Sequence, residues 1–96
     1  MARNFHRYKN FDVADYLNTK EEVSAYLSVV LEEGTADEFV QALGDVARSQ
    51  GIAAISRETG LGRESLYKSL QAGKKPQFET ILKVTRALGI KLQATA

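Results

Sequence analysis

The chain has 96 residues, no cysteine and a net charge of only +1, so it is long enough for one small domain and offers neither a disulfide framework nor a thiolate metal site. Its first ten residues carry charges where a signal peptide would be apolar, and no apolar run approaches the about 18 residues that span a bilayer. A single cytoplasmic domain without membrane attachment is therefore expected.

The charges are distributed unevenly along the chain. Residues 12–45 hold nine acidic residues against Lys20 alone, a net charge of −8, whereas residues 46–96 hold nine basic residues against three acidic ones, a net charge of +6. This separation predicts a C-terminal half that binds a polyanion and an acidic N-terminal half that binds a cationic partner. The alternative is that both halves are merely solvated surfaces.

The N-terminal third is expected to be a tail followed by helices. Residues 1–11 show little periodicity and predict a flexible tail, and residues 12–17 allow one short helical turn. Capping boxes at Thr19 and Thr35, each with glutamate three residues later, predict two longer helices, and a glycine ends each of them. Their predicted buried faces are Val23, Tyr26, Leu27, Val30 and Leu31 in the first helix, and Phe39, Leu43, Val46 and Ala47 in the second.

Residues 52–70 contain an apolar pattern that breaks once, at Gly60, and then restarts. Apolar residues recur at helical spacing on both sides of the break, which predicts two short helices packed together about a tight glycine turn. This is a helix-turn-helix pattern, whose second helix, expected over residues 63–71, enters the major groove in DNA-binding examples. The predicted buried residues are Ile52 and Ile55 before the turn and Leu66 and Leu70 after it.

The second helix of this pair would turn its polar side chains away from the core. Arg63 is suited to guanine, Glu64 to a cytosine amino group, and Tyr67 to a thymine methyl group or a phosphate. The neighbouring hydroxyl and ammonium groups are suited to positioning on the phosphate backbone. The predicted DNA-binding residues are Gly62, Arg63, Glu64, Ser65, Tyr67, Lys68, Lys74 and Lys75.

The C-terminal part predicts a loop over residues 71–77, a helix over residues 78–88 and a short strand over residues 90–94, where apolar and polar side chains alternate. A lone strand cannot satisfy its backbone groups, so Ile90 and Leu92 are expected to pair with the same strand of a second copy in a two-fold dimer. A frayed tail is the alternative. The predicted buried face of the helix comprises Phe78, Ile81, Leu82, Thr85 and Leu88.

Together these elements predict an all-α domain of five to six helices over residues 12–96. It would consist of acidic N-terminal helices over residues 12–34, a helix-turn-helix core over residues 35–88, and a C-terminal strand and tail over residues 89–96. The sole histidine is His6, in the predicted tail, and no phosphate-binding loop or metal-ligand pattern is present. The sequence therefore predicts no enzyme, no cofactor, no metal and no small-molecule substrate.

The segment LGDVARSQGIAAISRETGLGRESLYKSL, followed by PQFETILKVTRALGIKL, resembles the probable addiction-module antidote family, the HigA-like antitoxins of the Cro/repressor helix-turn-helix superfamily. The resemblance covers roughly residues 12–92, with one departure at Gly62, where the family commonly has serine. It implies a bacterial or phage-derived protein that neutralises a small basic RelE/ParE-like toxin. As a homodimer on double-stranded operator DNA, it would also repress the shared operon. The acidic segment would then meet the toxin through Asp12, Asp15, Tyr16, Glu21, Glu22 and Tyr26.

Two other functions remain open on the sequence. The chain can be a stand-alone phage-type transcriptional regulator without a toxin, which the absence of a small basic protein in the neighbouring reading frame would favour. It can also be a protein-interaction module whose helix-turn-helix does not bind DNA, because Glu64 introduces a negative charge among the basic residues of the second helix.

Overall fold

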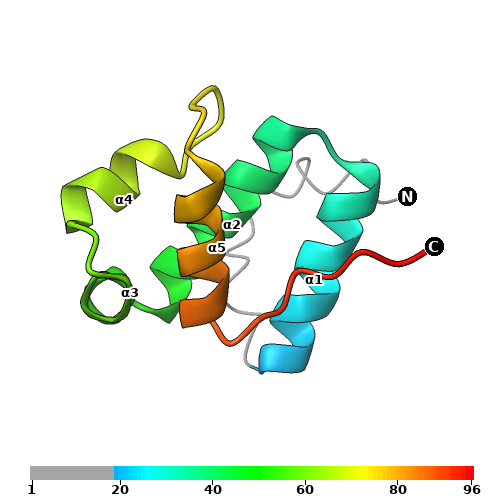
Figure 1. Ribbon diagram of the computed structural model, residues 1–96, viewed down its shortest axis with the longest axis horizontal. Coiled ribbons are helices and arrows are strands. Elements are labelled where there is room, and N and C mark those ends of the chain that lie inside the picture. The colour runs from blue at the N-terminus through cyan, green and yellow to red at the C-terminus, as the bar shows by residue number, and fades with distance from the viewer. Residues whose placement is uncertain (1–18) are drawn as a thin grey trace.

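The computed structural model describes residues 19–96 and contains five α-helices in this part of the chain. They are α1 (Lys20–Glu33), α2 (Ala36–Gln50), α3 (Ile52–Thr59), α4 (Arg63–Ser69) and α5 (Phe78–Ala87) (Figure 1). The prediction of an all-α fold is confirmed for these residues. The predicted tail over residues 1–11 and the short helical turn over residues 12–17 lie outside the described residues.

Local sequence determines where α1 and α2 begin. The Thr19 hydroxyl accepts a hydrogen bond from the N–H of Glu22 at 3.1 Å, and the Glu22 carboxylate accepts one from the N–H of Thr19 at 3.1 Å. Thr35 and Glu38 make the same reciprocal pair at 3.1 and 2.7 Å. Both predicted capping boxes are therefore confirmed, and each satisfies two backbone donors that a helix start would otherwise leave unpaired.

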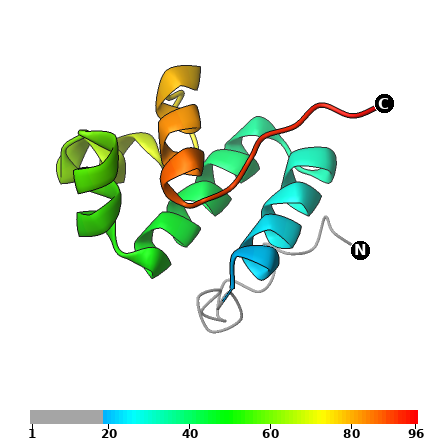
Figure 2. The ribbon, with the colours of Figure 1, turned by 60° about the horizontal axis from the view of Figure 1, so that its bottom comes forward.

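The helices are arranged with α1 at one end of the molecule and α4 at the other. Figures 1 and 2 both show α2 and α5 between these ends, with α3 beside α4. The principal packed pairs are α1 with α2, α2 with α3, and α3 with both α4 and α5. The largest of the fully buried side chains come from every helix except α3: Val30, Leu43, Val46, Leu66, Val84 and Thr85, together with Leu70 just after α4.

Most of the predicted buried residues are buried, with four exceptions. Leu31 is 50% exposed and Phe78 is 66% exposed, because each lies in a terminal turn of its helix, where the apolar period continues but the neighbouring helices no longer cover it. Tyr26 and Leu82 are half-buried. The remaining predicted core residues are buried: Val23, Leu27, Val30, Phe39, Leu43, Val46, Ala47, Ile52, Ile55, Leu66, Leu70, Ile81, Thr85 and Leu88.

The predicted C-terminal strand is not supported, because residues 90–96 form no strand within this chain. The chain turns at Gly89 (φ +77°), and the N–H of Ile90 then donates to the carbonyl of Thr85 at 2.9 Å, which closes α5 in a Schellman motif. This motif turns Ile90, 7% exposed, into the core of its own chain, and Leu92 packs half-buried against the same core. Figure 1 shows the segment running in extended form in front of α1. The predicted pairing of this segment with a second copy is therefore not supported, because Ile90 and Leu92 pack on the core of their own chain.

Candidate nucleic-acid interface and acidic helix

The helices α3 and α4 are joined by a three-residue turn over residues 60–62, as the glycine break predicts. Gly60 adopts a left-handed conformation (φ +76°), and its N–H donates to the carbonyl of Ser56 at 2.9 Å. The Ser56 hydroxyl donates to the carbonyl of Leu61 at 2.6 Å, and the N–H of Leu61 donates to the Thr59 hydroxyl at 3.1 Å. These hydrogen bonds join the end of α3 to the turn and so fix the direction in which α4 leaves it.

The short helix α4 is held in place by its apolar side. It has seven residues, too few to be stable without tertiary contacts, but Leu66 and the following Leu70 are 1% and 0% exposed. The end of α4 lies directly against α2 at Gly44, where a Cβ atom would overlap the carbonyl oxygen of Leu70. Sequence reasoning missed this contact, although a glycine in the middle of a helical pattern was a signal of close packing.

The opposite side of α4 is free for a partner. Arg63, Glu64, Ser65, Tyr67 and Lys68 are all exposed, with Tyr67 at 45%. Within residues 19–96, no hydrogen bond or ion pair engages the side chains of Arg63, Tyr67 or Lys68. At the start of α4, Gly62 is the N-cap and makes no side-chain bond. The predicted residues of this helix therefore share one solvent-exposed surface.

The loop between α4 and α5 carries two further predicted residues, Lys74 and Lys75, both exposed. A long-range bond fastens this loop to α2: the N–H of Ala72 donates to the Gln41 side-chain oxygen at 3.1 Å. The Gln41 amide in turn donates to Asp45 at 3.0 Å. Sequence reasoning missed Gln41, for which the only available signal was the glutamine–aspartate spacing of four residues on one helix face.

The helix α1 carries the described part of the predicted toxin site. Glu21 and Glu22 are exposed at its start, whereas Tyr26 is half-buried. Burial raises the pKa of Tyr26 to about 12, with a smaller contribution from the negative charge of Asp45. Asp45 itself forms an ion pair with Arg48 at 2.6 Å. Tyr26 therefore remains a neutral phenol at physiological pH.

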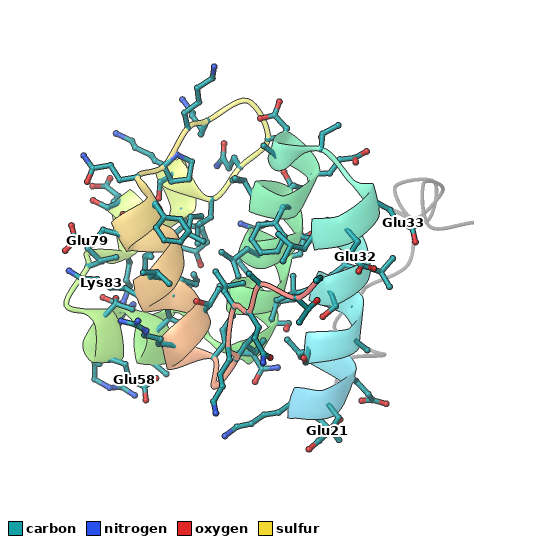
Figure 3. All side chains as sticks on the ribbon, turned by 45° about the vertical axis from the view of Figure 1, so that its right-hand side comes forward. Glu21, Glu32, Glu33, Glu58, Glu79 and Lys83 are labelled. Atoms are coloured by element: carbon teal, nitrogen blue, oxygen red, sulfur yellow. The ribbon has the colours of Figure 1, made fainter. Side chains whose placement is uncertain are left out.

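The glutamates of α1 and the charged pair of α5 lie on different sides of the molecule. Figure 3 shows Glu21, Glu32 and Glu33 along α1 on one side, and Glu79 and Lys83 of α5 on the other, where they form an ion pair at 3.7 Å. The predicted toxin-binding residues Asp12, Asp15 and Tyr16 lie outside the described residues. No helix within residues 19–96 is long and apolar enough to cross a bilayer, and no acidic cluster in this range is placed to hold a metal ion.

These features define a small all-helical protein with an exposed basic helix at one end and an acidic helix at the other. A family model described as "probable addiction module antidote protein" matches residues 7–96. A Haemophilus influenzae protein described as uncharacterized is 41% identical over 85 residues, which cover 88% of each chain. No solved structure matches the chain. The chain belongs to the family of probable addiction module antidote proteins, so the predicted antitoxin role is confirmed at the level of the family. That membership indicates a regulatory, non-enzymatic protein with a toxin as its partner.

Proposed function

We propose that this protein is the antitoxin of a type II toxin-antitoxin module, of the HigA-like, Cro/repressor helix-turn-helix type. In the bacterial cytoplasm it neutralises a RelE/ParE-like toxin and, as a homodimer, represses its own operon. The main support for the proposal is the way in which α4 is buried on one side and exposed on the other. Its apolar side is completely buried while Arg63, Tyr67 and Lys68 stand exposed without partners, in a chain that belongs to an antidote family.

The exposed side of α4 supports a role as a recognition helix. Arg63 occupies its first position, and the N-terminal residues of a recognition helix are those that reach base edges in the major groove. Lys68 lies further along the helix, and Lys74 follows in the loop, where ammonium groups suit phosphate contacts. A dimer would then place two copies of α4 about 34 Å apart on a palindromic operator.

Arg63→Ala is expected to weaken specific operator binding by about 1–3 kcal/mol, or about 5- to 150-fold in Kd. Its side chain has no partner among the described residues, so the fold should be unaffected and the loss should come from base contacts. The measurement is a fluorescence-anisotropy titration of duplex DNA from the chain's own upstream region, at about 150 mM salt, against unrelated DNA.

Lys68→Ala is the matched control for this titration. It removes a cation from the same exposed helix but is expected to weaken specific and unrelated DNA similarly and to reduce the salt slope by about 1. Unchanged operator affinity for Arg63→Ala would contradict the proposed DNA-binding role of Arg63. Wild-type protein without any preference for its own upstream DNA would favour the alternative of a protein-interaction module.

The acidic helix α1 supports the toxin-binding half of the proposal. Glu21 and Glu22 project from its first turn, and toxins of the RelE/ParE class are basic, so opposite charges would speed their association. The proposed site continues through Tyr26 and through Asp12, Asp15 and Tyr16, which precede α1 in the chain.

Toxin binding is tested by co-expressing the full chain with the small basic protein encoded beside it and purifying the complex. Glu21→Lys is expected to slow the association of the chain with this toxin about threefold to tenfold. The difference from the wild type should shrink as the salt concentration rises, because salt screens charge steering. Glu58→Lys is the matched control, because it makes the same charge reversal at an exposed site on α3. Equal effects of the two variants would contradict the assignment of the toxin to α1, and failure to co-purify would contradict the pairing itself.

A further inference from the structure

The loop between α4 and α5 is bound to α2 by the side chain of Gln41. The oxygen of its amide accepts a hydrogen bond from the N–H of Ala72 at 3.1 Å, and the nitrogen donates one to Asp45 at 3.0 Å. Because a carboxylate only accepts and a backbone N–H only donates, the amide can satisfy both partners in one orientation only. Among side chains of this length, glutamine alone carries a donor and an acceptor on the same carbon.

The face of α2 that carries Gln41 also holds the end of α4. Gln41, Asp45 and Arg48 recur at helical spacing and therefore share this face. Asp45 is fixed there by its ion pair with Arg48 at 2.6 Å. Gly44 lies beside them, in such close contact with the end of α4 that a Cβ atom would overlap the carbonyl oxygen of Leu70. One helix face thus positions both α4 and the loop that follows it.

The hydrogen bond to α2 is made within a tight turn. The N–H of Lys74 donates to the carbonyl of Gln71 at 3.1 Å, which closes a β-turn. Gly73 has φ +86°, whereas Ala72 has no positive φ, and this combination is typical of a type II turn. Lys74 ends the turn and Lys75 follows it directly. Both lysines therefore extend from backbone that is fixed by hydrogen bonds.

We propose that Gln41 is a positioning residue of the DNA-binding surface, which holds Lys74 and Lys75 beside α4 for contact with DNA phosphates. Both lysines are exposed, and neither has an ion-pair partner within residues 19–96. A loop that is ordered before binding avoids the loss of conformational freedom that weakens association. Gln41 is half-buried and acts through the loop. The inference rests on the proposed binding of DNA.

The structural part of the inference is tested without DNA. Gln41→Met keeps the length of the side chain but removes both the donor and the acceptor. In the full chain, we expect the Ala72 amide to exchange its hydrogen with solvent at least about tenfold faster than in the wild type. Gln50→Met is the matched control and should leave this rate unchanged, because Gln50 is exposed at the end of the same helix and takes no part in these bonds. Unchanged exchange at Ala72 in Gln41→Met would overturn the inference.

The functional part is tested by fluorescence anisotropy with duplex DNA from the chain's own upstream region and with unrelated duplex DNA. Gln41→Met should weaken binding of both about threefold to tenfold at about 150 mM salt and lower the salt slope by about 1, because phosphate contacts carry no sequence information. In a chain that already carries Lys74→Ala and Lys75→Ala, it should change affinity by less than about twofold. An equal loss in both backgrounds would overturn the inference, because Gln41 would then act on the fold as a whole.

Ala72→Pro removes the same hydrogen bond from the other partner and keeps the test valid if Gln41→Met does not fold. Proline suits the second position of a type II turn and has no N–H to donate. It should reproduce the loss of DNA affinity. A wild type that prefers its own upstream DNA, with neither substitution affecting affinity, would overturn the inference and leave the proposed repression intact. A wild type that binds all DNA alike, and loses affinity with either substitution, would support the inference and contradict the proposed repression alone.

Discussion

Gly44→Ala is expected to lower the free energy of unfolding by about 3 kcal/mol, although alanine is the better helix former. Gly44 is buried in the middle of α2, and a Cβ atom there would overlap the carbonyl oxygen of Leu70 and lie 3.1 Å from the Leu70 Cβ. These atoms belong to the backbone and to the root of a completely buried side chain, so they cannot rotate away. The variant must separate α2 from the end of α4.

The intrinsic gain from replacing glycine inside a helix is about 1 kcal/mol, which is smaller than the expected cost of the overlap. Chemical denaturation of the full chain measures the net change in the free energy of unfolding that results from this gain and this cost. Gly62→Ala is the matched control: its backbone has φ −68°, and a Cβ atom there meets nothing within 4 Å. Its effect should stay below about 1 kcal/mol. A Gly44→Ala variant as stable as the wild type would contradict the close contact between α2 and α4.

Leu66→Ala is the second substitution with a large expected effect, a loss of about 3 kcal/mol in the free energy of unfolding. Leu66 is 1% exposed and is the only residue buried within the seven residues of α4. Removing its side chain leaves a cavity in the core and also weakens the attachment of a helix too short to form alone. Operator affinity should therefore fall together with stability.

Denaturation midpoints compare Leu66→Ala with its neighbour Tyr67→Ala. Tyr67 is the larger side chain but points about 100° around the helix from Leu66 and is 45% exposed, so its loss should cost less than about 1 kcal/mol of stability. If the two variants lost equal stability, α4 would not have a buried side and a free side, and the proposed recognition surface would lose its physical basis.

The interpretations that proved correct from sequence rest on interactions between residues close in the chain. Thr19 with Glu22 and Thr35 with Glu38 are three residues apart, so the reciprocal capping bonds form wherever the helix starts. The turn at Gly60 needs a left-handed backbone, which only glycine adopts without strain. The buried and exposed sides of α4 follow from helical periodicity in the same way.

The incorrect interpretations concern residues whose environment is set by segments far away in the chain. Alternating side chains over residues 90–94 have the pattern of a strand, but the same pattern fits an extended segment that places Ile90 and Leu92 on a helical core. Periodicity also placed Phe78 on a buried face, because no sequence pattern tells how far a neighbouring helix extends.

The sequence by itself therefore determined the helices, their caps, the glycine turn, the separation of charge and the family of this protein, because each of these depends on local spacing or composition. Only the tertiary structure decided that Gly44 lies against the end of α4, that Gln41 binds the loop with Lys74 and Lys75, and that Leu31 and Phe78 line one uncharged groove. These features join residues 26 or more positions apart, and their proximity arises from the packing of whole helices, which no local pattern encodes.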